Sequence, residues 1–400
     1  GAQGGPSGLN QPARLTGAQE TSLAIAAAVV TANAYYIHPI IGDVADHFGV
    51  SHARIGLVPA LNQLALAVGI FMLLPLGDRI SNRRLTIAFA TGQTVSLAIM
   101  TLAEGFPLFV LGSTLLGYFT IAPYLLPAYA SKRVAPERLG QVTAKLAAGI
   151  ILGILVARVG AGVVSERYGW RAVYWMATAL MLAVTIALPR LMEGGERSAE
   201  GRQSYRDLLF SVFPLVGRHK EVLLSGAIQA LNFAQFIAVW LGLALYLTSP
   251  QMGYGTDTVG YLAGLAAVSI ISTPRLGRWA DHVGPRKART IFAVVQFAGI
   301  LLLWPLGGSL WGLLVPLIIT NLVGPGVDVT GRMTFLALDP AIRTRLTTVY
   351  VVIMFIGGGL GSYAGTAAYD AYGWAGTCIL LGLCSVTLTT LAALARRFGR

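Results

Sequence analysis

The feature of this chain that most restricts its fold is a series of long apolar stretches that carry almost no charge. The charged residues gather in short runs between these stretches. A helix needs about 20 residues to cross the roughly 30 Å hydrocarbon core of a bilayer. Each apolar stretch has about this number of residues. Of the 400 residues, 55% are apolar and only 12% are charged, too few to cover the surface of a water-soluble protein. The pattern therefore predicts an all-α membrane protein.

Short segments rich in polar residues, glycine or proline divide the apolar sequence into twelve predicted transmembrane helices. We expect them at residues 19–42, 54–77, 84–104, 107–130, 138–165, 170–191, 221–248, 257–279, 288–307, 310–336, 345–369 and 373–395. A long polar segment separates the first six from the last six. The predicted organisation is a flexible N-terminal tail (1–18), a six-helix bundle (19–192), a cytoplasmic linker (193–220) and a second six-helix bundle (221–400).

The basic residues lie mostly on one side of the predicted membrane. If the N-terminus is cytoplasmic, 23 of the 29 Lys and Arg residues fall on the cytoplasmic side, Arg286, Lys287 and Arg289 among them, and 3 on the outer side. Positive charge favours the cytoplasmic side of membrane proteins, so we expect both termini in the cytoplasm. The same bias explains the net charge of +12 without a nucleic-acid partner.

The two halves repeat each other at a nearly fixed offset. Asp78 and Asp281 follow spans 2 and 8 and are 203 residues apart, and the pairs Pro136/Pro340 and Trp170/Trp374 are each 204 apart. Three matches in the same order favour duplication of a six-helix unit. Transporters with such repeats bind their substrates between the halves.

The loops after spans 2 and 8 resemble the signature of the major facilitator superfamily, Gly-x-x-x-Asp-x-x-Gly-x-Arg-Lys/Arg. The second copy, residues 277–287, matches throughout, whereas the first has Leu74 and Ser81 in place of the glycines. The resemblance covers essentially the whole chain. It implies two pseudo-symmetric six-helix bundles that alternate in their access to a central substrate site, and usually a monomer.

A narrower resemblance links the chain to a bacterial branch of the 12-span drug:proton antiporters. It rests on residues 32–39 (Ala-Asn-Ala-Tyr-Tyr-Ile-His-Pro), on residues 75–79 and on the glycine row of span 5. The branch usually has Asn-Gln at Ile37-His38, and the usual span-5 proline after a glycine is missing. This resemblance implies export across a bacterial inner membrane.

The family resemblance implies a conformational switch in the two loops. A loop carboxylate would accept hydrogen bonds from a helix N-terminus or an arginine across the interface between the halves, and so hold one state. The basic residues would also anchor the loops to anionic lipid headgroups. Ordinary positive-inside charge is the alternative. The residues concerned are Asp78, Arg79, Arg83, Arg84, Asp281, Arg286 and Lys287.

Charged residues inside the predicted spans are the best candidates for function, because a charge in a bilayer is costly unless it faces a polar cavity. Asp328 on span 10 is the acid that lies well inside a span, and Arg332 is four residues later on the same helical face. Asp328 is thus either a proton carrier or a fixed counter-ion, depending on whether the two pair. Arg158 on span 5 is the main basic candidate, and His38 on span 1 is either a proton-coupling residue or a packed polar residue.

The family resemblance implies that spans 1, 2, 4, 5, 7, 8, 10 and 11 border the central cavity. Aromatic and amide side chains spaced along such spans are the usual means of orienting a small molecule. Packing is the alternative role for each of them. Together with Arg158 and Arg332, the predicted substrate-binding residues are Asn33, Tyr36, Gln63, Tyr124, Asn232, Gln235 and Trp240.

The sequence contains no ATP-binding loop, metal-ligand cluster or catalytic triad. We therefore predict a secondary transporter, with no cofactor and no enzymatic activity, whose partners are a small molecule, protons and membrane lipid. Two hypotheses stay open at this point. One is proton-coupled export of amphipathic molecules, and the other is proton-coupled uptake of an anionic solute such as an organic acid or a carboxylate siderophore, which Arg158 and Arg332 favour.

Overall fold

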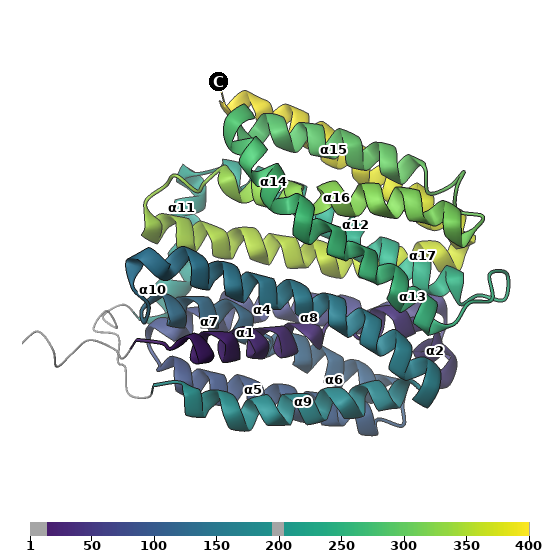
Figure 1. The fold of residues 1–400 in the computed structure, drawn as a ribbon, viewed down its shortest axis with the longest axis horizontal. Helices are drawn as coiled ribbons and strands as arrows, with labels where there is room; N and C mark the ends of the chain where they lie inside the picture. The colour runs from purple at the N-terminus through teal and green to yellow at the C-terminus, as the bar shows by residue number, and fades with distance from the viewer. Residues whose placement is uncertain (1–13, 194–203, 400) are drawn as a thin grey trace, which may run out of the picture.

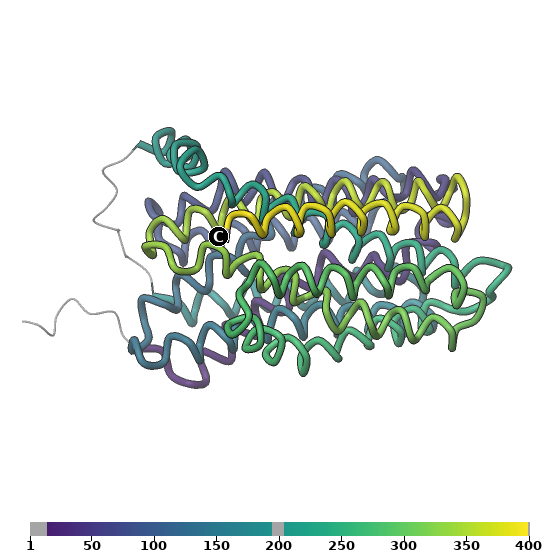
Figure 2. Tube along the Cα trace, turned by 90° about the horizontal axis from the view of Figure 1, so that it is seen from above, coloured from purple at the N-terminus to yellow at the C-terminus, as the bar shows by residue number. Residues whose placement is uncertain are grey.

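A computed structural model describes residues 14–193 and 204–399 of the protein. The chain is helical and forms two halves that lie side by side (Figure 1). The N-terminal half forms the lower part of the view and the C-terminal half the upper part. The helices of both halves run roughly parallel to the long axis of the molecule (Figure 2). The predicted tail (1–18) and linker (193–220) fall partly outside the described residues, at 1–13 and 194–203.

The N-terminal half makes six crossings, several of which consist of more than one helix. The first crossing begins with a capping box, in which Thr16 and Gln19 satisfy each other's backbone N–H groups. It is interrupted by a turn at residues 33–36. The helices, in chain order, are α1 (Gly17–Ala32), α2 (Ile37–Phe48), α3 (His52–Ile55), α4 (Leu57–Leu73), η1 (Leu74–Asp78), α5 (Asn82–Leu102), α6 (Phe106–Tyr118), α7 (Ala122–Ser131), η2 (Pro136–Arg138), α8 (Leu139–Tyr168) and α9 (Trp170–Leu191).

The C-terminal half is preceded by two short helices of the linker, α10 (Tyr205–Phe210) and α11 (Val212–Arg218). Its crossings are α12 (Glu221–Leu247), α13 (Thr256–Ala263) with η3 (Gly264–Ala267) and α14 (Val268–Val283), α15 (Pro285–Leu301), α16 (Leu310–Met333) and α17 (Pro340–Ala395), which is followed by η4 (Arg396–Gly399).

The predicted all-α, twelve-span fold is confirmed. Within residues 14–193 and 204–399, ten helical segments are long and apolar enough to cross a membrane. The last of them contains two crossings, because Gly373 has φ 65° and turns the chain between the two parts of α17. A left-handed φ costs glycine little. These segments account for eleven crossings. The remaining one, ninth in chain order, is α15, which at 17 residues is shorter than the other crossings.

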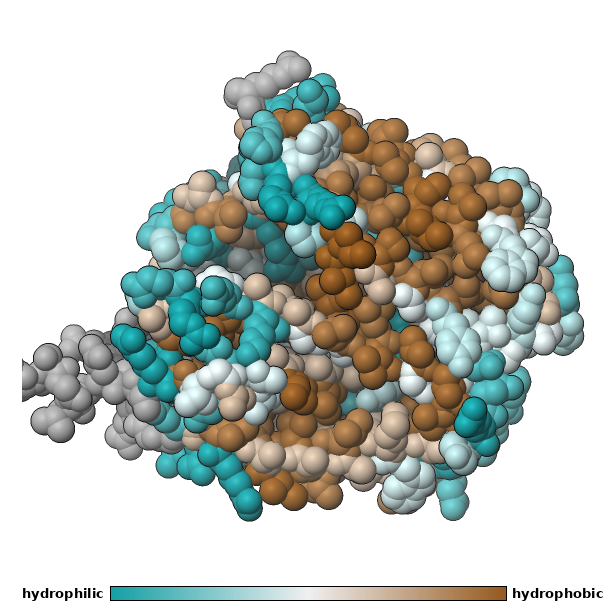
Figure 3. All heavy atoms as spheres, viewed as in Figure 1, coloured by the Kyte–Doolittle hydropathy of each residue, from teal (hydrophilic) through white to brown (hydrophobic). Residues whose placement is uncertain are grey.

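The outward-facing surface of the helices is apolar, as a bilayer requires. Large hydrophobic side chains are exposed along it, including Val156 (67%) and Trp311 (78%). Figure 3 shows brown, hydrophobic residues across the middle of the molecule and teal, hydrophilic residues near its two ends.

The end of the molecule that carries α10, α11 and η4 is called the linker end here, and the other is called the far end. The two halves are in close contact at the far end. The α8 helix packs against α13 there, and α3 and α4 pack against α17. On the linker side the surface is recessed between the halves (Figure 3), and α14 packs on α15 and α16 of its own half.

Candidate functional site

A fully buried arginine lies at the interface between the halves. Arg158, on α8, is 0% exposed. Its Nη2 lies 2.9 Å from His38 Nδ1 on α2. A guanidinium can only donate hydrogen bonds, so Nδ1 of His38 accepts and the imidazole proton resides on Nε2. His38 is therefore a neutral partner and leaves the charge of Arg158 uncompensated.

Aromatic rings from both halves surround this guanidinium. Its Cζ lies 5.4 Å from the ring centroid of Tyr35 in the N-terminal half, and 4.4 and 5.3 Å from those of Phe236 and Trp240 in the C-terminal half. Each such contact contributes about 0.5–2 kcal/mol. Because α12 supplies two of the three rings, separation of the halves would expose the guanidinium.

Two nitrogens of Arg158 remain unused in this cage. Among the described residues neither Nε nor Nη1 has a hydrogen-bond partner. Leaving a buried charge unpaired costs several kcal/mol, and a ligand carboxylate accepts strong, charge-assisted hydrogen bonds from a guanidinium. The geometry therefore suits an anionic group with a flat apolar body.

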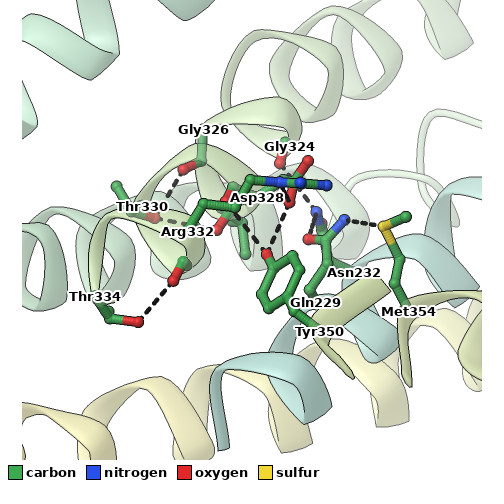
Figure 4. Close-up of polar contacts among 12 residues, drawn as sticks. Gln229, Asn232, Gly324, Gly326, Asp328, Thr330, Arg332, Thr334, Tyr350 and Met354 are labelled. Atoms are coloured by element: carbon green, nitrogen blue, oxygen red, sulfur yellow. Dashed lines mark hydrogen bonds and ion pairs between the residues drawn. The ribbon is translucent and has the colours of Figure 1, made fainter. Parts of the chain in front are cut away.

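A second charged cluster lies on α16 in the C-terminal half (Figure 4). Arg332 Nε donates to Asp328 Oδ1 at 3.0 Å, and the hydroxyl of Tyr350 on α17 donates to the same oxygen at 2.7 Å. The side chains of Asp328 and Arg332 are 30% and 37% exposed, so this pair faces an accessible space rather than packed protein. The sequence placed Asp328 and Arg332 on one helical face and left open whether they pair. In the structure they do.

Asn232, predicted to bind substrate, is instead saturated by contacts within its own half. Its Nδ2 donates to Gln229 Oε1 and to the Gly324 carbonyl, each at 3.0 Å (Figure 4), and its Oδ1 accepts from Gln296 Nε2 at 2.8 Å. These bonds join α12 to α15 and α16. This arrangement favours the packing role.

The other predicted polar residues are buried or half-buried, but few have contacts with Arg158. Asn33 Nδ2 lies 3.5 Å from Met181 Sδ, and Tyr36 is buried. Gln63 donates to its neighbour Asn62 at 3.1 Å. The ring of Tyr124 meets Phe355 of the other half with centroids 5.9 Å apart.

Gln235 differs from these residues. It is 3% exposed, and neither amide atom has a hydrogen-bond partner among the described residues. A buried amide without partners costs free energy, so Gln235, next to Phe236 of the cage, is a further candidate for ligand contact.

The loop residues make contacts mainly within their own halves. Arg83 donates to the Pro189 carbonyl on α9 at 2.9 Å. Arg286 forms two hydrogen bonds to Glu221 on α12, at 2.6 and 2.7 Å. Asp78 and Asp281 lie at the linker end, where the repeat placed them, as do Arg79, Arg84 and Lys287.

Arg289, counted with the cytoplasmic basic residues, also lies inside the predicted ninth span (288–307). Arg289 lies within α15 and is 0% exposed, because this helix begins at Pro285 and its first turns enter the protein.

The far end is closed by polar contacts between the halves that sequence reasoning missed. Glu166, near the end of α8, accepts from the Thr256 backbone N–H at 3.1 Å, at the N-terminus of α13. A carboxylate at a helix N-terminus is favoured by the helix dipole. The Thr256 hydroxyl also donates to the Gly162 carbonyl at 2.9 Å.

Sequence reasoning also missed Tyr350 and Phe236, since neither stands out in an apolar helix.

Comparison with known proteins decides the family. The sequence profile of the Major Facilitator Superfamily matches residues 23–338. The chain belongs to this superfamily. It is therefore a multi-pass membrane transporter of small molecules and not an enzyme.

Three curated relatives match between 62% and 94% of this chain. The uncharacterized transporter YgaY of Escherichia coli O157:H7 is 29% identical over 94% of this chain and 95% of its own length. A probable transporter of Streptomyces coelicolor is 27% identical over 90% of this chain and 83% of its own. The multidrug resistance protein MdtG of Escherichia fergusonii is 23% identical over 62% of this chain and 64% of its own.

Solved structures of the superfamily share the fold. The nucleoside transporter NupG aligns with a TM-score of 0.77 at 14% identity, over 94% of this chain and 99% of its own. A bacterial homologue of the lysosomal transporter Spinster, in an inward-facing and unoccupied conformation, aligns with a TM-score of 0.72 at 15% identity over 95% of both chains.

Proposed function

We propose that this chain is a proton-coupled exporter of small amphipathic molecules that carry an anionic group. The observation that carries the proposal is the aromatic cage around Arg158, in which two guanidinium nitrogens have no partner among the described residues. A lipophilic cation would meet a like charge there. A carboxylate attached to a flat ring would accept from one of these two nitrogens, which lie on different edges of the guanidinium, and would lie against Phe236 or Trp240.

Access to this cage depends on the two halves. Arg158 and His38 belong to the N-terminal half, whereas Phe236 and Trp240 belong to α12. The far-end contact between Glu166 and Thr256 is closed in this structure. Rocking of residues 1–192 against 221–400 would break that contact and open the cage toward the far end, which is the alternating access expected of the fold.

We propose Asp328 as the proton carrier, although its pairing with Arg332 is the arrangement of a counter-ion, because its side chain is 30% exposed and so stays within reach of protons. Its carboxylate is accessible and accepts from both Arg332 and Tyr350. Protonation would remove the charge that holds Arg332 and weaken both contacts. In this way the protonation state of Asp328 would alter the number of free positive charges in the C-terminal half.

The direction of transport is proposed from likeness to other proteins. The resemblance to drug:proton antiporters and the match to the multidrug resistance protein MdtG both support export across a bacterial inner membrane. The basic linker end supports its placement in the cytoplasm, with the chain acting as a monomer.

Uptake of an anionic solute together with protons is the second candidate, and one observation favours it. Arg332 donates a hydrogen bond to the Asp328 carboxylate. Protonation of Asp328 would therefore free Arg332 to bind an anion. A proton and an anion that assist each other's binding move in the same direction. An acidic organic solute would then accompany the proton inward.

A binding screen followed by vesicle transport tests these proposals. Purified protein is melted with benzoate and indole-3-acetate, and with tetraphenylphosphonium as the lipophilic cation. A ligand of the folded state raises Tm, so we expect a rise with the carboxylates that Arg158→Gln abolishes. The control Arg167→Gln changes an exposed residue of the same helix and should keep the rise.

Stabilisation by the cation alone, unchanged in Arg158→Gln, would refute the anionic substrate. For a carboxylate that binds, a pH gradient is imposed on inverted vesicles with an acidic interior. Accumulation of the carboxylate inside these vesicles indicates export in exchange for protons. Loss of preloaded carboxylate from them indicates transport together with protons, and so uptake.

A further inference from the structure

A second buried arginine lies outside the transport site. Arg289, on α15, is 0% exposed, and its Nη1 donates to Ser225 Oγ on α12 at 3.1 Å. Its Nε and Nη2 are buried without a hydrogen-bond partner among residues 14–193 and 204–399. As with Arg158, this is an incompletely satisfied charge in a medium that penalises it.

The nearby carboxylate does not neutralise Arg289. Glu221 is held by the two hydrogen bonds from Arg286, at 2.6 and 2.7 Å. In the described part of the chain no salt bridge within 4.0 Å involves Arg289. The linker end of the C-terminal half thus carries an excess of positive charge.

A pocket of about 370 Å³ lies at this same place, where the linker joins the C-terminal half. Three of its lining residues, Arg218, His219 and Lys220, are basic in type, and one, Glu221, is acidic. The remaining lining residues are mostly apolar: Gly217, Val222, Thr334, Phe335, Leu338, Leu346 and Phe398. Basic and apolar walls together suit an amphipathic anion.

Hydroxyl groups connect this pocket to Arg289. The Ser225 hydroxyl, which accepts from Arg289, lies 3.0 Å from the Thr334 hydroxyl, and Thr334 lines the pocket. The Thr334 hydroxyl donates to the Gly331 carbonyl at 2.6 Å. An anion seated against Thr334 would draw this proton to itself and would lie three hydrogen bonds away from the guanidinium, through the Thr334 and Ser225 hydroxyls. At that distance its charge would offset part of the unpaired charge of Arg289.

We propose that this pocket is a binding site for a phosphate group, placed against Thr334 with Arg218 and Lys220 beside it. The tetrahedral anion would supply negative charge near Arg289, which Glu221 does not neutralise because Glu221 is held by Arg286. The apolar walls favour a phospholipid headgroup as its source, with free phosphate as the other source of the same chemistry. The site is separate from the Arg158 cage and does not depend on the direction of transport.

The test measures Tm of the full chain in nanodiscs. The first arm compares pure phosphatidylcholine with the same lipid containing phosphatidylglycerol. The second arm adds inorganic phosphate to phosphatidylcholine nanodiscs, with sodium chloride of equal ionic strength as the reference. Binding to the folded state raises Tm. We expect a rise in the first arm; a rise in the second arm alone would identify free phosphate as the ligand.

Three variants separate this site from general lipid effects. Arg289→Gln should lose the rise, and it should melt higher than the wild type in pure phosphatidylcholine because the uncompensated charge is gone. Lys220→Gln, at the surface of the pocket, should lose part of the rise even if Arg289→Gln folds poorly. Arg278→Gln, exposed on α14 at the same end, should keep it. No rise in either arm, or a full rise in both Arg289→Gln and Lys220→Gln, would overturn the proposal.

Discussion

The contact between α8 and α13 predicts that a single methyl group will change the balance between the two access states. A Cβ added at Gly162 would lie 2.5 Å from the Thr256 carbonyl oxygen and 3.1 Å from Gly260 Cα. Ordinary contacts of this kind are about 3.5 Å or longer, so Gly162→Ala would require the two helices to separate by about 1 Å. The contact exists only while the far end is closed.

The magnitude follows from the cost of overpacking, about 1–3 kcal/mol. Since each 1.4 kcal/mol is tenfold, the ratio of far-end-open to far-end-closed molecules should rise about 5- to 150-fold. Gly160→Ala is the matched control, because a Cβ at Gly160 has no atom within 4 Å.

The measurement is a spin-label distance across the far end. Labels are placed through Arg167→Cys and Gln251→Cys, both exposed positions, after the native Cys378 and Cys384 are changed to serine. Gly162→Ala should shift the distance distribution to longer values, and Gly160→Ala should not. If both variants keep the wild-type distribution, α8 and α13 do not form a gate and the rocking proposal loses its main support.

Three further predictions concern the charged residues. Arg158→Met should raise Tm of the ligand-free protein, since it removes an uncompensated buried charge, while abolishing transport; a lower Tm would mean that the charge is satisfied. Asp328→Asn should uncouple transport from a pH gradient, with a loss of about 5- to 150-fold in proton-driven accumulation but intact counterflow of substrate; retained driving by the gradient would exclude Asp328. Glu166→Gln exchanges a charged for a neutral hydrogen bond, worth about 1 kcal/mol, and should shift the same spin-label distances toward the open form about fivefold, unlike Glu104→Gln, which changes an exposed acid outside this contact.

The sequence was sufficient for the fold because its signal is strong and local. A span of about 20 apolar residues has few alternatives, and the repeat from Asp78 to Asp281 required two equivalent halves. The pairing of Asp328 with Arg332 was also foreseeable, since residues four apart on a helix share a face. Local spacing therefore predicts the spans and the contacts within a helix.

The contacts that form the site depend instead on how separate helices are rotated. Phe236 is one aromatic residue in an apolar helix, and only the packing of α12 on α2 places it over Arg158. Tyr350 reaches Asp328 from 22 residues away. The sequence placed Arg289 at the start of the ninth span, next to Arg286 and Lys287, and could not show that its guanidinium is buried.

The interruption at residues 33–36 gives the first crossing two different attachments. The α1 helix packs against α7, α8 and α9 of its own half, whereas α2 also contacts α12 and α13 of the other half. Tyr35 and His38, which touch Arg158, lie in or just after this interruption. The first crossing is thus a jointed element rather than a rod, and its outer part can follow the C-terminal half for some distance while α1 stays in place. Opening of the far end would then proceed in stages, in which His38 and α2 at first move with α12 away from Arg158 and only later part from the C-terminal half.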